Sequence, residues 1–328
     1  MGDNAAPLPC LHFHLRGIFV MKEKILTKAP VVCLLTFICC FLWGSAFPCI
    51  KIGYRLFQIS SGDTASQILF AGIRFTLAGI LTLLIGSIAS RKILRPGKDS
   101  LKPIAVLSMV QTVIQYFFFY IGLAHTTGVK SSIIEASSSF FAILIASLIF
   151  RYETLTVRKV LGCLIGFAGV VVINLAGGSM DLNLSLNGEG FILLSTISYA
   201  FSSALIKKYS QHENPVVLSG CQFLLGGLIL SLCGAFMGGR LTAFTPASVL
   251  LLIYMALISA VAYSLWGILL KHNPVSRISI FGFMNPVIGV LLSAVLLNEK
   301  NQAFSIYGLI SLVLVCVGIY IVNRQKKL

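Results

Sequence analysis

Residues 140–153 read FFAILIASLIFRYE, and residues 286–299 read PVIGVLLSAVLLNE. Each stretch is an apolar run that closes with a glutamate, and a shift of 146 residues superposes Glu153 on Glu299. The runs are too apolar and too continuous to alternate between a core and water, so they are typical of helices that lie in lipid. The repetition predicts that the chain contains two related halves.

The rest of the chain has the same character. Of its 328 residues, 57% are apolar and 11% are charged, whereas a soluble domain carries about 25% charged residues. About 20 apolar residues are needed for a helix to cross ~30 Å of hydrocarbon. Ten runs of roughly that length follow one another, at 30–52, 64–90, 101–124, 128–150, 156–177, 187–209, 214–239, 246–271, 274–297 and 302–323.

Lysine and arginine are distributed unevenly between the loops. With the N-terminus inside the cell, 19 of the 25 basic residues fall in inner segments, five fall in outer loops, and Arg74 lies within a run. This bias follows the positive-inside rule, and it places both termini in the cytoplasm. It also assigns the net charge of +15 to membrane topology, so nucleic acid is not predicted as a partner.

Each half holds five runs, and because five is odd, the second half must enter the membrane in the opposite sense. We therefore predict an all-α integral membrane protein with ten transmembrane helices, arranged as two inverted five-helix repeats. The first repeat covers residues 30–177 and the second covers residues 187–323. Residues 1–29 are predicted to form a cytoplasmic segment, and Met21 looks like a natural start, so residues 1–20 are interpreted as an upstream extension.

Several motifs resemble those of a known family. They are Leu42-Trp43-Gly44-Ser45-Ala46-Phe47, Arg74-Phe75, which a shift of 148 residues places over Gln222-Phe223, and the two glutamate–glycine units Glu153…Gly162…Gly166…Gly169 and Glu299…Gly308…Gly318. With them, the chain from about residue 30 to 323 resembles the EamA family of the drug/metabolite transporter superfamily. One departure is that the proline expected before the closing run is present as Pro286 but replaced by Phe140 in the first copy.

The resemblance implies a ten-helix secondary transporter that moves small organic solutes, often by exporting amino acids or related metabolites. It also implies a multi-pass protein of a plasma membrane, such as a bacterial inner membrane. A small organic solute and membrane lipid are then the expected partners, with protons as a further candidate, and no cofactor is expected. The sequence itself leaves the oligomeric state open.

Polar and aromatic residues recur inside the apolar runs, as expected for the lining of a transport cavity. The candidates are Trp43, Ser45, Gln111, Gln115, Tyr116, Ser198, Tyr199, Ser202, Tyr263, Trp266 and Asn285. An alternative explanation for the serines is that small residues let transmembrane helices pack closely.

Two charges lie deep within runs. Glu135 is a carboxylate and Arg74 a cation of similar depth, and a charge at such a position costs at least ~2.5 kcal/mol on insertion scales. Glu135 could carry a proton or meet a substrate ammonium while Arg74 binds a carboxylate. Alternatively, the two residues could neutralise each other, or Arg74 could extend towards the interface. Structural roles are expected for Glu153 and Glu299, each before a helix N-terminus, and for Pro286.

Two other classes of function remain as alternatives. A membrane-embedded enzyme would need a catalytic constellation, but the five histidines form no HExxH motif and the chain has no GxSxG motif. We therefore predict neither catalytic residues nor metal ligands, and the protein is not expected to be an enzyme. A channel-like facilitator would need a filter or a ring of polar loops, and no such sequence stands out.

Overall fold

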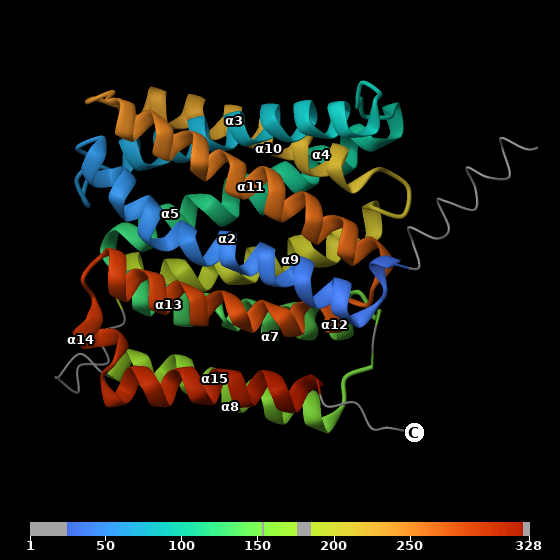
Figure 1. Cartoon of the computed structure of the whole chain (residues 1–328), viewed down its shortest axis with the longest axis vertical. Coiled ribbons are helices and arrows are strands. Elements are labelled where there is room, and N and C mark those ends of the chain that lie inside the picture. Colours follow the sequence, from blue (N-terminus) through green and yellow to red (C-terminus); the bar gives the residue numbers. More distant parts are fainter. Residues whose placement is uncertain (1–24, 153, 176–184, 324–328) are drawn as a thin grey trace, which may run out of the picture.

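The structure is a computed structural model that describes residues 25–152, 154–175 and 185–323. All regular structure in these residues is helical (Figure 1). Glu153 and residues 1–20, for which the sequence made predictions, lie outside the described residues.

The first half contains α2 (Ala29–Leu56), α3 (Thr64–Ser90), η1 (Lys98–Ser100), α4 (Leu101–Leu107), η2 (Ser108–Ile114), α5 (Gln115–His125), α6 (Gly128–Glu135), α7 (Ser137–Leu144), η3 (Ile145–Ile149) and α8 (Val157–Leu175). The second half contains η4 (Leu186–Gly190), α9 (Phe191–Tyr209), α10 (Pro215–Phe236), α11 (Pro246–His272), α12 (Val275–Ser279), η5 (Ile280–Phe283), α13 (Met284–Leu296), α14 (Lys300–Ala303) and α15 (Ile306–Asn323).

Eight helical segments of the described chain are long and apolar enough to cross a membrane: Ala29–Leu56, Thr64–Ser90, Lys98–His125, Gly128–Ile149, Leu186–Tyr209, Pro215–Phe236, Pro246–His272 and Arg277–Leu296. They correspond to eight of the ten runs that the sequence predicts as spans. The other two predicted spans correspond to α8, with 19 residues, and α15, with 18 residues.

The outer surface of the bundle is apolar. Phe236 is 87% exposed, Ile88 is 77% exposed and Leu164 is 63% exposed. Helices with large apolar side chains on the outside are the arrangement that lipid demands. The protein is therefore a multi-pass membrane protein.

The helices form layers, which are seen in Figure 1. The pair α3 and α10 lies at one edge of the molecule, and the pair α8 and α15 lies at the opposite edge. Between them, α2 packs against α11 and α13, while α9 packs against α5 and α7. The centre of the molecule is thus built from helices of both halves.

Glycines let α3 and α10 approach to backbone contact. A Cβ atom on Gly79 would lie 2.5 Å from the backbone nitrogen of Leu224, and one on Gly227 would overlap the backbone of Phe75 and Thr76. The hydrophobic effect does not drive association between helices in lipid. Small residues at the interface allow the close van der Waals packing that holds such helices together. This close packing holds α3 and α10 together as one pair at the edge of the bundle.

Helix starts follow local sequence rules. Proline stands at the first position of α10 and of α11, where its missing N–H is not needed. At the start of α11, Thr245 and Ser248 form a capping box, in which the Thr245 hydroxyl accepts from the Ser248 N–H at 3.2 Å.

Glu299 caps a helix of the other half. Its two carboxylate oxygens accept hydrogen bonds from the N–H groups of Gly128 at 3.2 Å and Val129 at 3.0 Å, in the first turn of α6. A carboxylate at this position satisfies free N–H groups and favours the positive end of the helix dipole. The contact joins the α13–α14 connection to α6.

Tight turns interrupt the segments Gly128–Ile149 and Arg277–Leu296. Between α12 and α13, η5 forms a 3₁₀ turn, and Pro286 follows it with no N–H to donate to the carbonyl of Gly282. Between α6 and α7, Ala136 takes part in three-residue turns in which the Ser139 N–H donates to the Ala136 carbonyl at 3.2 Å. A shift of 146 residues superposes Ala136 on Gly282, so the interruptions lie at equivalent positions.

Candidate functional site

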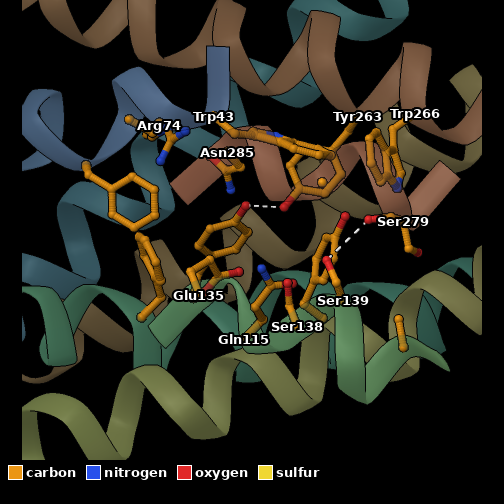
Figure 2. Close-up of a pocket in the computed structure, with 17 residues that line it drawn as sticks. Trp43, Arg74, Gln115, Glu135, Ser138, Ser139, Tyr263, Trp266, Ser279 and Asn285 are labelled. Atoms are coloured by element: carbon orange, nitrogen blue, oxygen red, sulfur yellow. Dashed lines mark hydrogen bonds between the residues drawn. The ribbon is translucent and has the colours of Figure 1, made fainter. Parts of the chain in front are cut away.

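A cavity of about 60 Å³ lies between the central helices, with room for several water molecules at roughly 10–15 Å³ each (Figure 2). It is lined by Trp43, Ala46, Phe47, Arg74, Gln115, Tyr116, Phe119, Glu135, Ser138, Ser139, Ala142, Tyr199, Tyr263, Trp266, Ser279, Gly282 and Asn285. Both halves of the chain contribute to this lining.

Most residues singled out in the sequence meet at this cavity. From the first half they are Trp43 on α2, Arg74 on α3, Gln115 and Tyr116 on α5, and Glu135 on α6. From the second half they are Tyr199 on α9, Tyr263 and Trp266 on α11, and Asn285 on α13.

Four other candidates do not line the cavity. The Ser45 hydroxyl lies 2.9 Å from the Tyr254 hydroxyl, and Ser202 donates to the Tyr199 carbonyl of its own helix. Ser198 donates to the Val110 carbonyl at 2.6 Å, which ties α9 to η2. Gln111 accepts from the amide of Gln222, and this pair joins η2 to α10. These four side chains connect helices or satisfy the backbone.

Sequence reasoning missed several lining residues around the helix interruptions. Ser138 and Ser139 follow Glu135 by three and four positions, which places them on the same helix face. Ser279 and Gly282 precede Asn285 at steps of three. This spacing from an already suspected residue is the signal that would have found them.

The interruptions face each other across the cavity. The Ser139 hydroxyl donates to the Ser279 carbonyl at 3.3 Å, and Figure 2 shows both residues at the same end of the site. A 3₁₀ turn leaves carbonyl groups outside the regular helix ladder, and a neighbouring hydroxyl can reach them. The contact links α7 directly to the end of α12.

An aromatic wall surrounds the indole of Trp43. Its ring centroid lies 4.9 Å from that of Trp266, 5.0 Å from that of Tyr263 and 6.1 Å from that of Tyr199, all in edge-on geometry. Edge-to-face pairs at these spacings are favourable beyond their burial. Four rings from three helices therefore hold one another in place around the cavity.

Behind this wall, a second set of rings joins the halves. The Phe75 and Tyr116 centroids lie 4.1 Å apart, the Phe75 and Phe223 centroids 5.3 Å apart, and the Phe223 and Tyr263 centroids 5.0 Å apart. The hydroxyls of Tyr116 and Tyr263 contact each other and close the ring of contacts. Two of the tyrosines that line the cavity, Tyr116 and Tyr263, are thus packed against phenylalanines of the α3–α10 pair.

Arg74 is 2% exposed and bridges three helices. Its Nε donates to the Met255 carbonyl at 3.1 Å, Nη1 to the Tyr120 hydroxyl at 2.6 Å, and Nη2 to the Ser259 hydroxyl at 3.0 Å. The guanidinium carbon also lies 4.8 Å from the centroid of the Phe75 ring. Arg74 does not reach the surface, and no ion pair joins it to Glu135 within the described chain.

Glu135 is 9% exposed, and no hydrogen bond or ion pair engages its carboxylate among the described residues. Lys130, which is on α6 like Glu135, forms its ion pair with Glu189 instead, at 3.2 Å. A buried carboxylate without a partner is costly, and this one lies at the cavity. Within the described residues, no group of three or more His, Cys, Asp or Glu side chains is placed to hold a metal ion.

One carboxylate outside the spans is well satisfied. Glu213 accepts from the Ser100 hydroxyl at 2.6 Å and the Gly97 N–H at 3.1 Å, so it joins the α3–α4 connection to the α9–α10 connection. Partial burial by itself would raise the pKa of this carboxyl. The hydrogen bonds from Ser100, Asn214 and Gly97, together with Lys271, outweigh that effect and hold the pKa below its usual value.

Comparison with solved structures gives the same architecture. A crystal structure of a protein with 18% sequence identity superposes with a TM-score of 0.67, covering 90% of this chain and 97% of that chain. At this identity the likeness shows the fold alone.

Several relatives are described as transporters. An uncharacterized transporter of Archaeoglobus fulgidus is 29% identical over 294 residues, which are 87% of this chain and 95% of that protein. The uncharacterized inner membrane transporter YedA of Escherichia coli is 27% identical, over 85% of this chain and 89% of that protein. A probable amino-acid metabolite efflux pump of Salmonella typhimurium is 26% identical, over 85% and 90%.

The profile of the EamA-like transporter family matches the chain in two segments, residues 30–175 and residues 186–324. These segments cover well over half of the protein, and the resemblance that the sequence motifs indicated is confirmed. The protein is a multi-pass membrane transporter for small solutes, and the chain belongs to the EamA-like transporter family.

Proposed function

We propose that this protein is a secondary transporter that exports a small organic solute, such as an amino acid or a related metabolite, across a plasma membrane by alternating access. The main support for this proposal is the cavity at the centre of the bundle, which is lined by residues of both family-matched segments. A site near the midplane between two repeats is the arrangement typical of alternating-access carriers.

A count of ten spans is part of the proposal. The lengths of α8 and α15, 19 and 18 residues, are close to what a membrane crossing requires. The two helices pack against each other, and a Cβ atom on Gly318 would lie 2.5 Å from the carbonyl oxygen of Gly162. This glycine contact supports a pair of adjacent membrane-spanning helices.

The contacts support two inverted repeats. A shift of 148 residues relates Arg74 to Gln222 and Gln111 to Ser259. Arg74 donates to Ser259, and Gln222 donates to Gln111, so each contact becomes the other when the two halves are exchanged. The helix contacts follow the same relation. α2 packs against α11 and α13 of the second half, and α9, its counterpart, packs against α5 and α7 of the first half.

Packed side chains lie on both sides of the cavity along its helices. On α2, Trp43 and Phe47 line the cavity, while Cys39 and Cys40 before them and Tyr54 after them belong to buried clusters. A channel would need a continuous polar path past these clusters. Packing on both sides favours a carrier, in which each side opens in turn.

The proposed solute, direction of transport and membrane are inferred from the relatives and from the chemistry of the cavity. The relative from Salmonella typhimurium is described as a probable amino-acid metabolite efflux pump, and YedA as an inner membrane transporter. Arg74 and Glu135 bring a cation and a carboxylate to the same cavity without pairing to each other. A small polar solute with charged groups suits such a lining.

Counterflow in proteoliposomes tests the proposal. Vesicles loaded with a pool of amino acids and other metabolites are diluted into labelled solute, and the expected result is transient uptake that vesicles without protein lack. A flux with no dependence on solute on the far side would indicate a channel-like facilitator. Chemical conversion of the pool, followed by mass spectrometry, would indicate an enzyme.

A further inference from the structure

We propose that the cavity recognises its solute through a positively charged amine, which binds to the Glu135 carboxylate and to the amide oxygens of Gln115 and Asn285. The inference rests on the proposed function, and it names the chemical group that the carrier selects. A carboxylate on the solute is not required.

Three unpartnered acceptors carry the argument. Gln115 Oε1, Glu135 Oε2 and Asn285 Oδ1 are buried oxygens that have no hydrogen-bond partner among the described residues, and all three side chains line the cavity. They come from α5, α6 and α13, so three separate helices present acceptors to one space. Buried acceptors are normally satisfied, and those left open at a cavity indicate a donor that binds there.

The donor that fits is a protonated amine. A primary ammonium carries three N–H groups and one positive charge, which matches three acceptor oxygens, one of them on a carboxylate. Charge-assisted hydrogen bonds of this kind are the strongest that a buried site can form. Figure 2 shows Glu135 and Gln115 on the same side of the site, with Asn285 across from them.

The rings of the wall favour the same charge. Trp43, Tyr199, Tyr263 and Trp266 line the cavity together, and an ammonium within about 6 Å of a ring centroid is attracted to the ring face. The Trp43 Nε1 donor has no partner among the described residues, and it is placed to serve a carbonyl or hydroxyl elsewhere on the solute.

Arg74 argues against recognition of a carboxylate. Its Nε, Nη1 and Nη2 atoms already donate to Met255, Tyr120 and Ser259, and its side chain is 2% exposed. Release of these bonds for an incoming anion would leave three groups on neighbouring helices without their donor. Arg74 therefore acts as a bridge between helices, and its positive charge orients an amine towards the Glu135 side of the cavity.

The fluorescence of the protein offers a binding assay that is independent of transport. The chain has two tryptophans, Trp43 and Trp266, and both line the cavity. Purified protein in lipid nanodiscs is titrated with matched triplets: an amino acid, its amide, which lacks the carboxylate, and its N-acetyl derivative, which lacks the charged amine. Triplets with small, branched and basic side chains cover the unknown part of the solute.

The expected result is that amino acids and their amides change the tryptophan emission with similar affinity, while N-acetyl derivatives do not. Glu135→Gln should weaken amine binding on the order of 30-fold or more, because a buried charge pair is lost. Glu213→Gln, which removes a carboxylate far from the cavity, should leave binding unchanged. If Glu135→Gln does not fold, Asn285→Leu keeps the volume but removes one acceptor, and about tenfold weaker binding is expected.

Opposite results overturn the inference. Binding of N-acetyl derivatives without binding of amides would show that the carboxylate is the recognised group, and unchanged affinity in Glu135→Gln would remove the proposed partner. Emission that responds to no amine, in a protein that exchanges other solutes in proteoliposomes, would refute amine recognition and leave the carrier intact. Amine binding without any exchange would support recognition and count against the carrier.

Discussion

Arg74 Nη2 donates a hydrogen bond to the hydroxyl of Ser259, at 3.0 Å, across the boundary between the two halves of the chain. Both residues are buried. The bond is one of three that the Arg74 guanidinium donates to acceptors on α5 and α11. A cation that stays charged in a lipid-embedded bundle must be surrounded by acceptors, and here two helices supply them. The relationship makes Arg74 a structural centre of the bundle.

Removal of this acceptor should destabilise the protein. In Ser259→Ala, one guanidinium N–H is left buried without a partner, which costs about 1–3 kcal/mol. Thermal unfolding in detergent measures the effect. The matched control is Ser195→Ala, because the buried Ser195 hydroxyl donates to the Ile192 carbonyl of its own helix, and its loss should cost under about 1 kcal/mol. Equal losses in the two variants would contradict this account of Arg74.

Close packing of α3 on α10 should not tolerate a methyl group. A Cβ atom in Gly227→Ala would overlap the backbone of Phe75 and Thr76, so the helices must move apart at a cost of about 1–3 kcal/mol or more. Gly62→Ala is the control, since nothing lies within 4 Å of its added Cβ atom. The fall in unfolding temperature is compared between the two variants. An equal fall in both would contradict the backbone contact between α3 and α10 at Gly227.

Coupling to protons can be separated from exchange at Glu135. If the carboxylate carries the proton, Glu135→Gln in proteoliposomes should lose accumulation driven by a pH gradient, because the amide cannot bind and release a proton. Exchange at saturating solute should persist, since the remaining acceptors of the cavity still hold the solute. Retained pH-driven accumulation in the variant would assign proton coupling to another group.

Acid should weaken the contact that Glu213 makes between two loops. The pKa of this carboxyl is lower in the folded protein than its usual value, so its contribution to stability is present above the unfolded pKa of about 4.3. That contribution is lost as the pH falls through the lower, folded pKa. The difference in unfolding temperature between the unmodified protein and Glu213→Gln should therefore shrink between pH 6 and pH 3.5. A difference that stays constant or grows would contradict the assignment.

How far the sequence could predict the site is clear from individual residues. Trp43, Glu135 and Tyr263 stood out as large polar or charged groups inside apolar runs, and the structure brings them to one cavity. Such groups are costly in lipid, so they must face the interior of the bundle. Gln111 met the same criterion but contacts Gln222 instead, because a second buried amide can satisfy the first.

For serines, the sequence gives a weaker indication of whether the side chain lines the cavity. A serine hydroxyl can donate to its own helix backbone, as Ser202 does to Tyr199, and it then needs no cavity and no partner helix. Ser139 and Ser279 do meet across the cavity, at helix interruptions that hydropathy does not reveal. Pro286 marked one interruption in the sequence, but the equivalent position holds Phe140, and the break at Ala136 has no comparable signal.

The sequence by itself determined the apolar helices, the bias of basic residues, the relation between the halves and the family, because all of these depend on local composition and spacing. Only the tertiary structure decided which face of each helix meets the cavity. Helical periodicity places residues on a common face, but the rotation of a helix against its neighbours is set by backbone contacts such as Gly227 on Thr76. Those contacts form between residues far apart in the chain, and they decide that Glu135, Gln115 and Asn285 line one cavity while Arg74 is held by Ser259.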